Sequence, residues 1–231
     1  MPNEEQPGPG PVRVLLADDE EMIRRGVGMI LRHADGIEVV GEAVNGAEAV
    51  TLAAELRPDV ALVDIRMPVL DGLAAIAPLV ALDPKPQVVM LTTFGDEENV
   101  MRALQAGAGG FLLKDEGPDE LIRAVRAAAA GDAVLSPGVT GTVIKRMLAG
   151  GTAPGSPAGA PAPEDRLATL TAREREVLSM LGAGLPNVEI GLRLGIGLGT
   201  VKTHVGAILD KTGSDSRVQA ALLAHQAGLA S

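Results

Sequence analysis

The first half of the chain alternates short apolar runs with helical segments, five times in succession. The apolar runs are rich in Val, Ile and Leu, and several are apolar almost throughout. Strands of a parallel sheet have this composition because both of their faces are buried. Five repeats of this kind predict an α/β fold with a doubly wound, five-stranded parallel sheet. The predicted strands cover residues 12–17, 38–43, 59–65, 87–93 and 110–114.

The segments between these runs have the patterns of helices. Pro118 stands where the first turn of a helix tolerates proline, and Gly131 ends the same segment. In doubly wound sheets, ligands bind beyond the carboxyl ends of the strands. Polar residues at those ends are therefore candidates for a functional site. We expect helices over residues 21–32, 46–55, 72–82, 97–105 and 118–130.

Composition divides the chain into two modules. Residues 149–163 contain only Ala, Gly, Pro, Ser and Thr, which cannot bury enough apolar surface to fold. We interpret them as a linker, since a loop of this length within one compact domain is uncommon. The remaining chain is expected to form a disordered tail, an α/β domain, a partly helical connection and a second domain, over residues 1–11, 12–132, 133–148 and 164–231.

Charge supports the same division. The formal net charge is −10, yet Lys and Arg balance Asp and Glu from residue 164 onward. The whole excess of negative charge therefore lies before that residue. An acidic module joined to a neutral, locally basic one indicates two separate tasks.

Several functional classes are excluded or disfavoured. The chain has no cysteine, which excludes disulfides and thiolate metal sites. The first residues lack the pattern of a signal peptide, and no apolar run approaches the roughly 20 residues that span a bilayer. We therefore expect a cytoplasmic protein without membrane contact. A metabolic phosphotransferase is disfavoured because the sequence has no nucleotide-binding loop, and we do not expect an enzyme.

Polar side chains follow four of the predicted strands. Asp18 and Asp19 follow the first, and Asp64, Thr92 and Lys114 end the third, fourth and fifth. Carboxylates gathered at one edge repel each other unless a cation is present, and Mg²⁺ is the natural solution. A carboxylate beside Mg²⁺, a lysine and a hydroxyl donor can attack a phosphoryl group. Taken singly, the acidic pair could be a solvated turn and the lysine a surface residue, but their common position favours a site.

The motifs LLADDE, LVDIRMPVLDG, MLTTF and GAGGFLLKD closely resemble the receiver domain of two-component response regulators. The resemblance covers about residues 12–130 and implies the flavodoxin-like strand order 2-1-3-4-5. It implies that Asp64 accepts the phosphoryl group, and that Asp19 and Asp64 ligate Mg²⁺ with the backbone carbonyl of Arg66. Asp18 would act on the cation through water.

The same resemblance assigns the switch residues. Thr92 would supply the switch hydroxyl, Lys114 would pair with the phosphate, and Phe111 would turn inward with Thr92. Phe111 could also be a residue of the core, and the two roles are compatible.

The second module shows the pattern of a small all-α domain with four helices. Thr171 and Glu174 match a capping box at the start of the first helix, and Pro186 opens the second. Gly195 separates that helix from a third that begins near Gly197, and a fourth follows over residues 216–227. Two short helices joined by a glycine turn predict a helix-turn-helix.

LTAREREVL, GLPNVEI, TVKTHV and SRVQA resemble the DNA-binding domain of the LuxR/NarL class, which includes FixJ-like regulators. The resemblance covers about residues 165–229 and implies that the third helix enters the major groove of double-stranded promoter DNA. It also implies a dimer contact through the fourth helix. His204 could donate to a phosphate or pack within the domain. The expected DNA-contacting residues are Thr200, Lys202, Thr203, His204, Lys211 and Arg217.

Glycines weaken the second and third helices. Gly191, Gly199 and Gly206 together could cost about 2–3 kcal/mol of helix stability. Gly206 stands one turn after Lys202, where it either lets the backbone approach DNA closely or removes a useful side chain.

The sequence thus predicts a response regulator transcription factor of the NarL/LuxR class. A sensor histidine kinase would phosphorylate Asp64, and the change would control dimerisation and DNA binding. The alternative is a signalling receiver whose weakened output domain acts through protein–protein contacts or as a phosphate sink.

Overall fold

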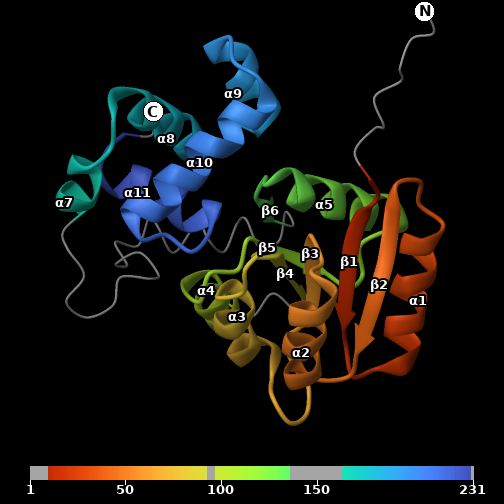
Figure 1. Cartoon of the computed structure of the whole chain (residues 1–231). Helices are drawn as coiled ribbons and strands as arrows, with labels where there is room; N and C mark the ends of the chain where they lie inside the picture. The colour runs from red at the N-terminus through yellow and green to blue at the C-terminus, as the bar shows by residue number, and fades with distance from the viewer. Residues whose placement is uncertain (1–9, 93–96, 136–162, 230–231) are drawn as a thin grey trace, which may run out of the picture.

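The computed structural model describes residues 10–92, 97–135 and 163–229. The predicted linker and connection, and the predicted N-terminal tail, lie almost entirely outside the described residues. Figure 1 shows an α/β domain and a separate group of helices that packs against it. Among the described residues, no helix has the length and apolar character needed to cross a membrane.

The described part of the α/β domain contains one parallel sheet with the strand order β2-β1-β3-β4-β5-β6. The first five strands confirm the predicted order, but the prediction of five strands is wrong by one. The additional strand has only two residues, too few to show a period, and pairs with Gly110. A Cβ atom at Gly110 would lie 2.9 Å from that of Val134, so glycine allows this approach. The strands are β1 (Val12–Ala17), β2 (Ile37–Ala43), β3 (Val60–Asp64), β4 (Gln87–Thr92), β5 (Gly110–Leu113) and β6 (Val134–Leu135).

Helices cover both faces of this sheet. Successive residues of a strand alternate between the faces: Leu15 packs with the core under α2, α3 and α4, and Val14 packs with the core under α1 and α5. Both side chains are fully buried, as the apolar character of the run predicts. The helices are α1 (Glu21–Arg32), α2 (Gly46–Leu56), α3 (Gly72–Val80), α4 (Glu97–Gln105) and α5 (Pro118–Ala130).

The output module consists of helices α7 to α11, and α7 was not predicted as a separate helix. The capping box is confirmed: the Thr171 hydroxyl accepts from the Glu174 N–H, and the Glu174 carboxylate accepts from the Thr171 N–H. Gly195 adopts the left-handed conformation, with a φ of 64°, at the turn of the helix-turn-helix. The bounds are α7 (Pro163–Ala168), α8 (Ala172–Gly182), α9 (Asn187–Leu194), α10 (Leu198–Thr212) and α11 (Arg217–Gln226).

Gly191 is not simply a weak point of its helix. A Cβ atom there would lie 2.9 Å from the carbonyl oxygen of Ile196, so the turn between α9 and α10 requires glycine. At Gly199 and Gly206 a Cβ atom would meet nothing within 4 Å, and their cost to the helix is not offset by a close contact. The interpretation of Gly191 as a helix weakener is therefore corrected by its packing.

Gly72 has the tightest surroundings of the glycines described. It opens α3, and a Cβ atom would lie 1.9 Å from the carbonyl oxygen of Asp64. The Gly72 N–H donates to the Ile65 carbonyl at 2.9 Å. Glycine at this position thus lets α3 begin directly against the end of β3.

We expect Gly72→Ala to lower the free energy of unfolding by about 1–3 kcal/mol, because the new methyl group must displace backbone. Gly26→Ala is the matched control, since a Cβ atom at Gly26 in α1 would meet nothing within 4 Å. That change should stabilise the protein by about 0.5–1 kcal/mol. Urea unfolding followed by circular dichroism measures both, and an unchanged midpoint for Gly72→Ala would contradict the packing.

Candidate functional site

The polar residues predicted from the strand ends meet at the carboxyl edge of the sheet. Asp18 follows β1, Asp64 ends β3 and Thr92 ends β4. Lys114 follows β5, and its N–H donates to the carbonyl of Thr92 at 2.7 Å, which extends the pairing of these two strands. The parallel register therefore brings together residues that are far apart in the sequence.

Lys114 is the centre of this group. Its Nζ lies 2.8 Å from Oδ2 of Asp18 and 3.1 Å from Oδ1 of Asp64. The Lys114 side chain is only 4% exposed, and the carboxylates of Asp18 and Asp64 are also buried. A third carboxylate, that of the exposed Glu20, lies 3.7 Å away. One buried ammonium group thus bridges two buried carboxylates.

The surroundings change the pKa values of both partners. Burial raises the pKa of Asp64 above its ordinary value, although the charge and hydrogen bond of Lys114 act in the opposite direction. Burial alone would lower the pKa of Lys114, but its hydrogen bond to Asp18 and the charges of Asp64 and Asp18 raise it. The surroundings therefore favour the charged form of Lys114 and disfavour the charged form of Asp64.

The acidic side chains fit a divalent cation. Asp18, Asp19 and Asp64 each offer a carboxylate oxygen, and these oxygens lie within 4.8 Å of one another. Asp19 is exposed, so the group is open to solvent. A set of oxygen donors with room for water is what Mg²⁺ prefers. Arg66 follows Asp64 by two residues in the loop before α3, and its side chain is exposed.

Thr92 and Phe111 occupy different positions near this edge. Thr92 is buried at the end of β4, beside the acidic group. Phe111 is fully buried in the core between the sheet and α2, α3 and α4, and it is paired in register with Met90. Phe111 is thus a core residue in this structure, as one of the two sequence interpretations expects.

Sequence reasoning missed one residue that contacts the acidic loop. Nη1 of Arg24 in α1 donates to the carbonyl oxygen of Asp18 at 2.7 Å. The position of Arg24, one helical turn after Glu20, is the only sequence signal that could have drawn attention to it.

Helix α10 turns part of its surface toward the receiver module. Nζ of Lys202 donates to the carbonyl of Ala129, at the end of α5, at 3.3 Å. Lys202, Gly206 and Leu209 line a cavity of about 260 Å³, and Gln87 and Gly131 line it from the other module. Thr200 and Thr203 are exposed and His204 is half-buried. Of the α10 residues that the sequence assigned to DNA, Lys202 thus reaches the α/β domain with its side chain, whereas Thr200 and Thr203 stay exposed.

Lys211 and Arg217 have partners within the protein. Nζ of Lys211 lies 2.7 and 2.8 Å from the two carboxylate oxygens of Glu174, and its hydrogen bonds lower the pKa of that carboxyl group. Arg217 is buried between the modules, where Nη1 lies 2.6 Å from Oδ1 of Asn187 and 3.2 Å from Oδ1 of Asp132. Both cations are engaged in contacts that the sequence did not reveal.

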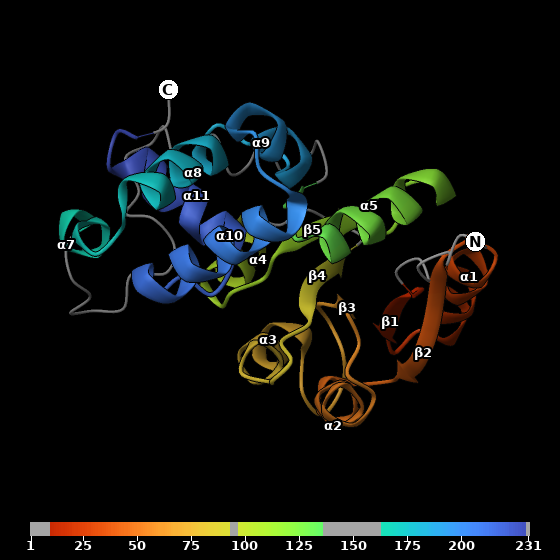
Figure 2. The same cartoon turned by 45° about the horizontal axis from the view of Figure 1, so that its top comes forward.

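Helix α11 packs on both modules. Val218 and Leu222 join the core of the α/β domain, whereas Leu223 lies in the core of the output module. Nε2 of the buried Gln219 donates to the carbonyls of Leu104 and Gln105, at the C-terminal end of α4, at 2.9 and 3.0 Å. Figure 2 shows α11 beside α4.

Comparison with known families divides the chain in the same way. Residues 14–126 match the family described as response regulator receiver domain. Residues 168–224 match the family described as bacterial regulatory proteins, luxR family.

Whole proteins with this arrangement are similar over nearly the full chain. The transcriptional regulatory protein LiaR of Bacillus subtilis is 40% identical, over 93% of this chain and 97% of its own. The nitrate/nitrite response regulator protein NarL of Escherichia coli K12 is 39% identical, over 94% and 96%.

Solved structures agree. The response regulator ChrA of a heme-sensing two-component system has a TM-score of 0.51 at 35% identity, covering 95% of this chain and 99% of its own. The receiver domain of a NarL from Mycobacterium tuberculosis has a TM-score of 0.52 at 40% identity, covering 53% of this chain and 99% of its own. The chain therefore belongs to the NarL/LuxR class of response regulators, which pair a receiver domain with a helix-turn-helix domain and regulate transcription.

Proposed function

We propose that Asp64 accepts a phosphoryl group from a sensor histidine kinase and that this event controls binding of the output module to promoter DNA. The observation that carries the proposal is the placement of Asp64 beside the Lys114 ammonium, 3.1 Å away, at the carboxyl edge of the sheet. A carboxylate oxygen of Asp64 attacks phosphorus, the bond from phosphorus to the histidine nitrogen breaks, and the imidazole leaves.

Asp19 and Asp64 are the residues we expect to hold Mg²⁺, together with the carbonyl of Arg66, while Asp18 acts through water. The three carboxylates support this assignment because they lie close together and are open to solvent on the side of Asp19. Bound Mg²⁺ supplies positive charge to the phosphoryl oxygens.

The protein's own residues then respond to the new charge. Lys114 is bonded to Asp64 and Asp18 and can keep its charge while it pairs with the phosphoryl oxygens. Thr92 stands next to Lys114 in the β4–β5 pairing and can offer its hydroxyl as a donor. A shift of Thr92 would alter the space around the buried Phe111 and bias the surface near α4.

Docking of the output module supports the proposed control. Gln219 donates a hydrogen bond to the C-terminal end of α4, and Arg217 and Lys202 donate to carbonyls at the C-terminal end of α5. While its ammonium donates to the Ala129 carbonyl, the Lys202 side chain is directed toward α5 rather than toward a DNA phosphate. Release of these contacts would free α10 for the major groove and α11 for a second copy of the chain, which gives a homodimer linked to phosphorylation.

The alternative function keeps the receiver chemistry but gives the output module another use. Lys211 and Arg217 are engaged within the protein, which leaves few cations for DNA phosphates. The open surroundings of Gly199 and Gly206 also leave α10 without compensation for its helix weakeners. A phosphate sink or a protein–protein signalling role would follow if the module does not bind DNA. The cytoplasm is the compartment that fits either role.

Acetyl phosphate with Mg²⁺ should phosphorylate the protein at Asp64, and Asp64→Asn should abolish the labelling. Phosphorylation should also tighten binding to promoter fragments in fluorescence anisotropy, with an affinity that falls steeply as salt rises. Peptide mass spectrometry locates the label, and a label that persists at another residue in Asp64→Asn would overturn the acceptor. Labelling without any sequence-specific DNA binding would favour the phosphate sink.

Gln219→Glu should open the protein without phosphorylation, because the new carboxylate faces the carbonyls of Leu104 and Gln105. Loss of this buried donor costs about 1–3 kcal/mol, so DNA binding should tighten about tenfold. The test is anisotropy in an Asp64→Asn background. Gln226→Glu is the matched control, since it makes the same change at an exposed position of the same helix. Equal effects of the two variants would refute control by docking.

Asp64→Asn should raise the melting temperature of the metal-free protein at neutral pH. The raised pKa of Asp64 means that the folded state favours the protonated acid. The stability associated with this group is therefore present below the unfolded pKa, about 3.9, and is lost as pH rises through the folded value. The gain from the variant should shrink as pH falls toward 4, and calorimetry at several pH values with EDTA measures it. A variant that is less stable at neutral pH would contradict the uncompensated charge.

A further inference from the structure

We propose that Arg24 is a positioning residue for the acidic site, because its guanidinium fixes the peptide that joins Asp18 to Asp19. In this way it sets the direction of the Asp19 carboxylate toward a divalent cation. The inference rests on the proposed cation site. It adds Arg24, a residue of α1 whose charge partner is Glu42 and not one of the predicted ligands.

The backbone of Asp18 is held on several sides. Its N–H donates to the carbonyl of Ala43 at 3.1 Å, and its Oδ1 accepts from the N–H of Glu20 at 2.9 Å. Nη1 of Arg24 completes the set with the 2.7 Å bond to the Asp18 carbonyl oxygen. The carbonyl of Asp18 and the nitrogen of Asp19 belong to one planar peptide unit. A donor that fixes this oxygen therefore also fixes the start of the exposed residue Asp19.

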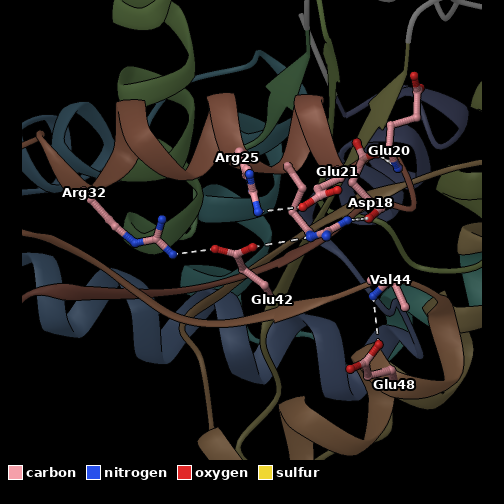
Figure 3. A network of polar contacts seen from close by, with 9 residues as sticks. Asp18, Glu20, Glu21, Arg25, Arg32, Glu42, Val44 and Glu48 are labelled. Atoms are coloured by element: carbon pink, nitrogen blue, oxygen red, sulfur yellow. Dashed lines mark hydrogen bonds and ion pairs between the residues drawn. The ribbon is translucent and has the colours of Figure 1, made fainter.

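Arg24 is itself held by a chain of charges. Its Nε lies 3.3 Å from Oε2 of Glu42 on β2, and its side chain is 13% exposed. The other oxygen of Glu42 pairs with Arg32, as Figure 3 shows. A Cβ atom at Gly28 would lie 3.0 Å from Nη1 of Arg32, so glycine there leaves room for this arm. The guanidinium of Arg24 is therefore restrained at Nε by Glu42, and it donates to the Asp18 carbonyl through Nη1.

The neighbouring Arg25 makes a useful contrast. It pairs with Glu21 at 2.6 Å (Figure 3), but its side chain is 75% exposed and that of Glu21 is 63% exposed. Exposed pairs of this kind contribute little to stability and position nothing. The two arginines thus carry the same charge on the same helix, and only one of them bonds to the loop of the acidic site.

The sign of the effect on cation binding tests the proposal. Removal of a nearby positive charge by itself would tighten the binding of a cation. Loss of a group that orients a ligand weakens metal binding, by about 10–100-fold in known sites. Arg24→Ala should therefore raise the Kd for Mn²⁺, used as the probe in the full unphosphorylated chain, by about tenfold. Electron paramagnetic resonance of free Mn²⁺ gives the Kd directly.

Two further variants separate positioning from stability and from bulk charge. Arg24→Lys keeps one donor for the Asp18 carbonyl and should recover part of the affinity, whereas Arg25→Ala should leave the Kd unchanged or slightly lower. Circular dichroism melting with EDTA shows whether each variant is folded before the metal is added. An unchanged or lower Kd for a folded Arg24→Ala overturns the positioning role.

A last variant tests the cation site on which the inference rests. Asp19→Asn should weaken Mn²⁺ binding strongly. If it does so while Arg24→Ala does not, the site stands and the role of Arg24 is refuted. If Asp19→Asn leaves the Kd unchanged, both the proposed cation site and the positioning role are overturned.

Discussion

The buried ammonium of Lys114 is the interaction on which the receiver module depends. Two buried carboxylates at one edge of a sheet would repel each other and lose hydration, at a cost of several kcal/mol per ion. Lys114 offsets much of this cost because it lies within 3.1 Å of both. Its position depends in turn on the parallel pairing of β4 and β5, which continues to the Lys114 N–H. The site and the sheet therefore stabilise each other.

Incomplete compensation gives this site its chemical character. Asp64 keeps a raised pKa in spite of Lys114, because burial outweighs the attraction of a single ammonium. Added positive charge is therefore favourable at this edge, and Asp19 stands at its solvent side with an exposed side chain. The same imbalance supports the proposed role of Asp64 as a switch rather than as a structural ion pair. Its neighbours are already arranged for a change in charge.

The two modules meet through donors that satisfy the C-terminal ends of helices. Such ends carry unpaired carbonyls and partial negative charge. Gln219 serves α4, and Arg217 and Lys202 serve α5. Both helices are connected to strands whose ends carry site residues, since Thr92 ends β4 and Lys114 follows β5. The contacts of α10 and α11 are therefore made to helices that follow site-bearing strands in the chain, as the proposed control requires.

The charge balance of the output module has a related consequence. Lys211 compensates the buried Glu174 of the capping box, and Arg217 compensates Asp132 across the interface. The cationic side chains that the sequence assigned to DNA therefore have different kinds of partner within the protein. Lys211 has a partner within its own module, whereas Arg217 and Lys202 have partners in the receiver module. Only the last two would change partners on opening.

Local signals in the sequence were sufficient for most of the secondary structure and for the acidic site. The helices α1, α4 and α5 have the predicted bounds, because periodicity, Pro118 and Gly131 act within a few residues. The residues of the site were predictable because strand ends in a parallel sheet share one edge. Contacts between distant residues could not be predicted in this way. Strand β6 is too short to show a pattern, and the requirement for glycine at Gly191 depends on a backbone oxygen across a turn.

The sequence by itself determined the alternation of strands and helices, the place of the acidic site and the helix-turn-helix, since each follows from spacing along the chain. The order of the strands followed from the resemblance to receiver domains. Only the tertiary structure decided the partners of Arg24, Lys211, Arg217 and Gln219. These long side chains reach groups on other elements, and their choice of partner depends on how helices pack, which no local pattern encodes.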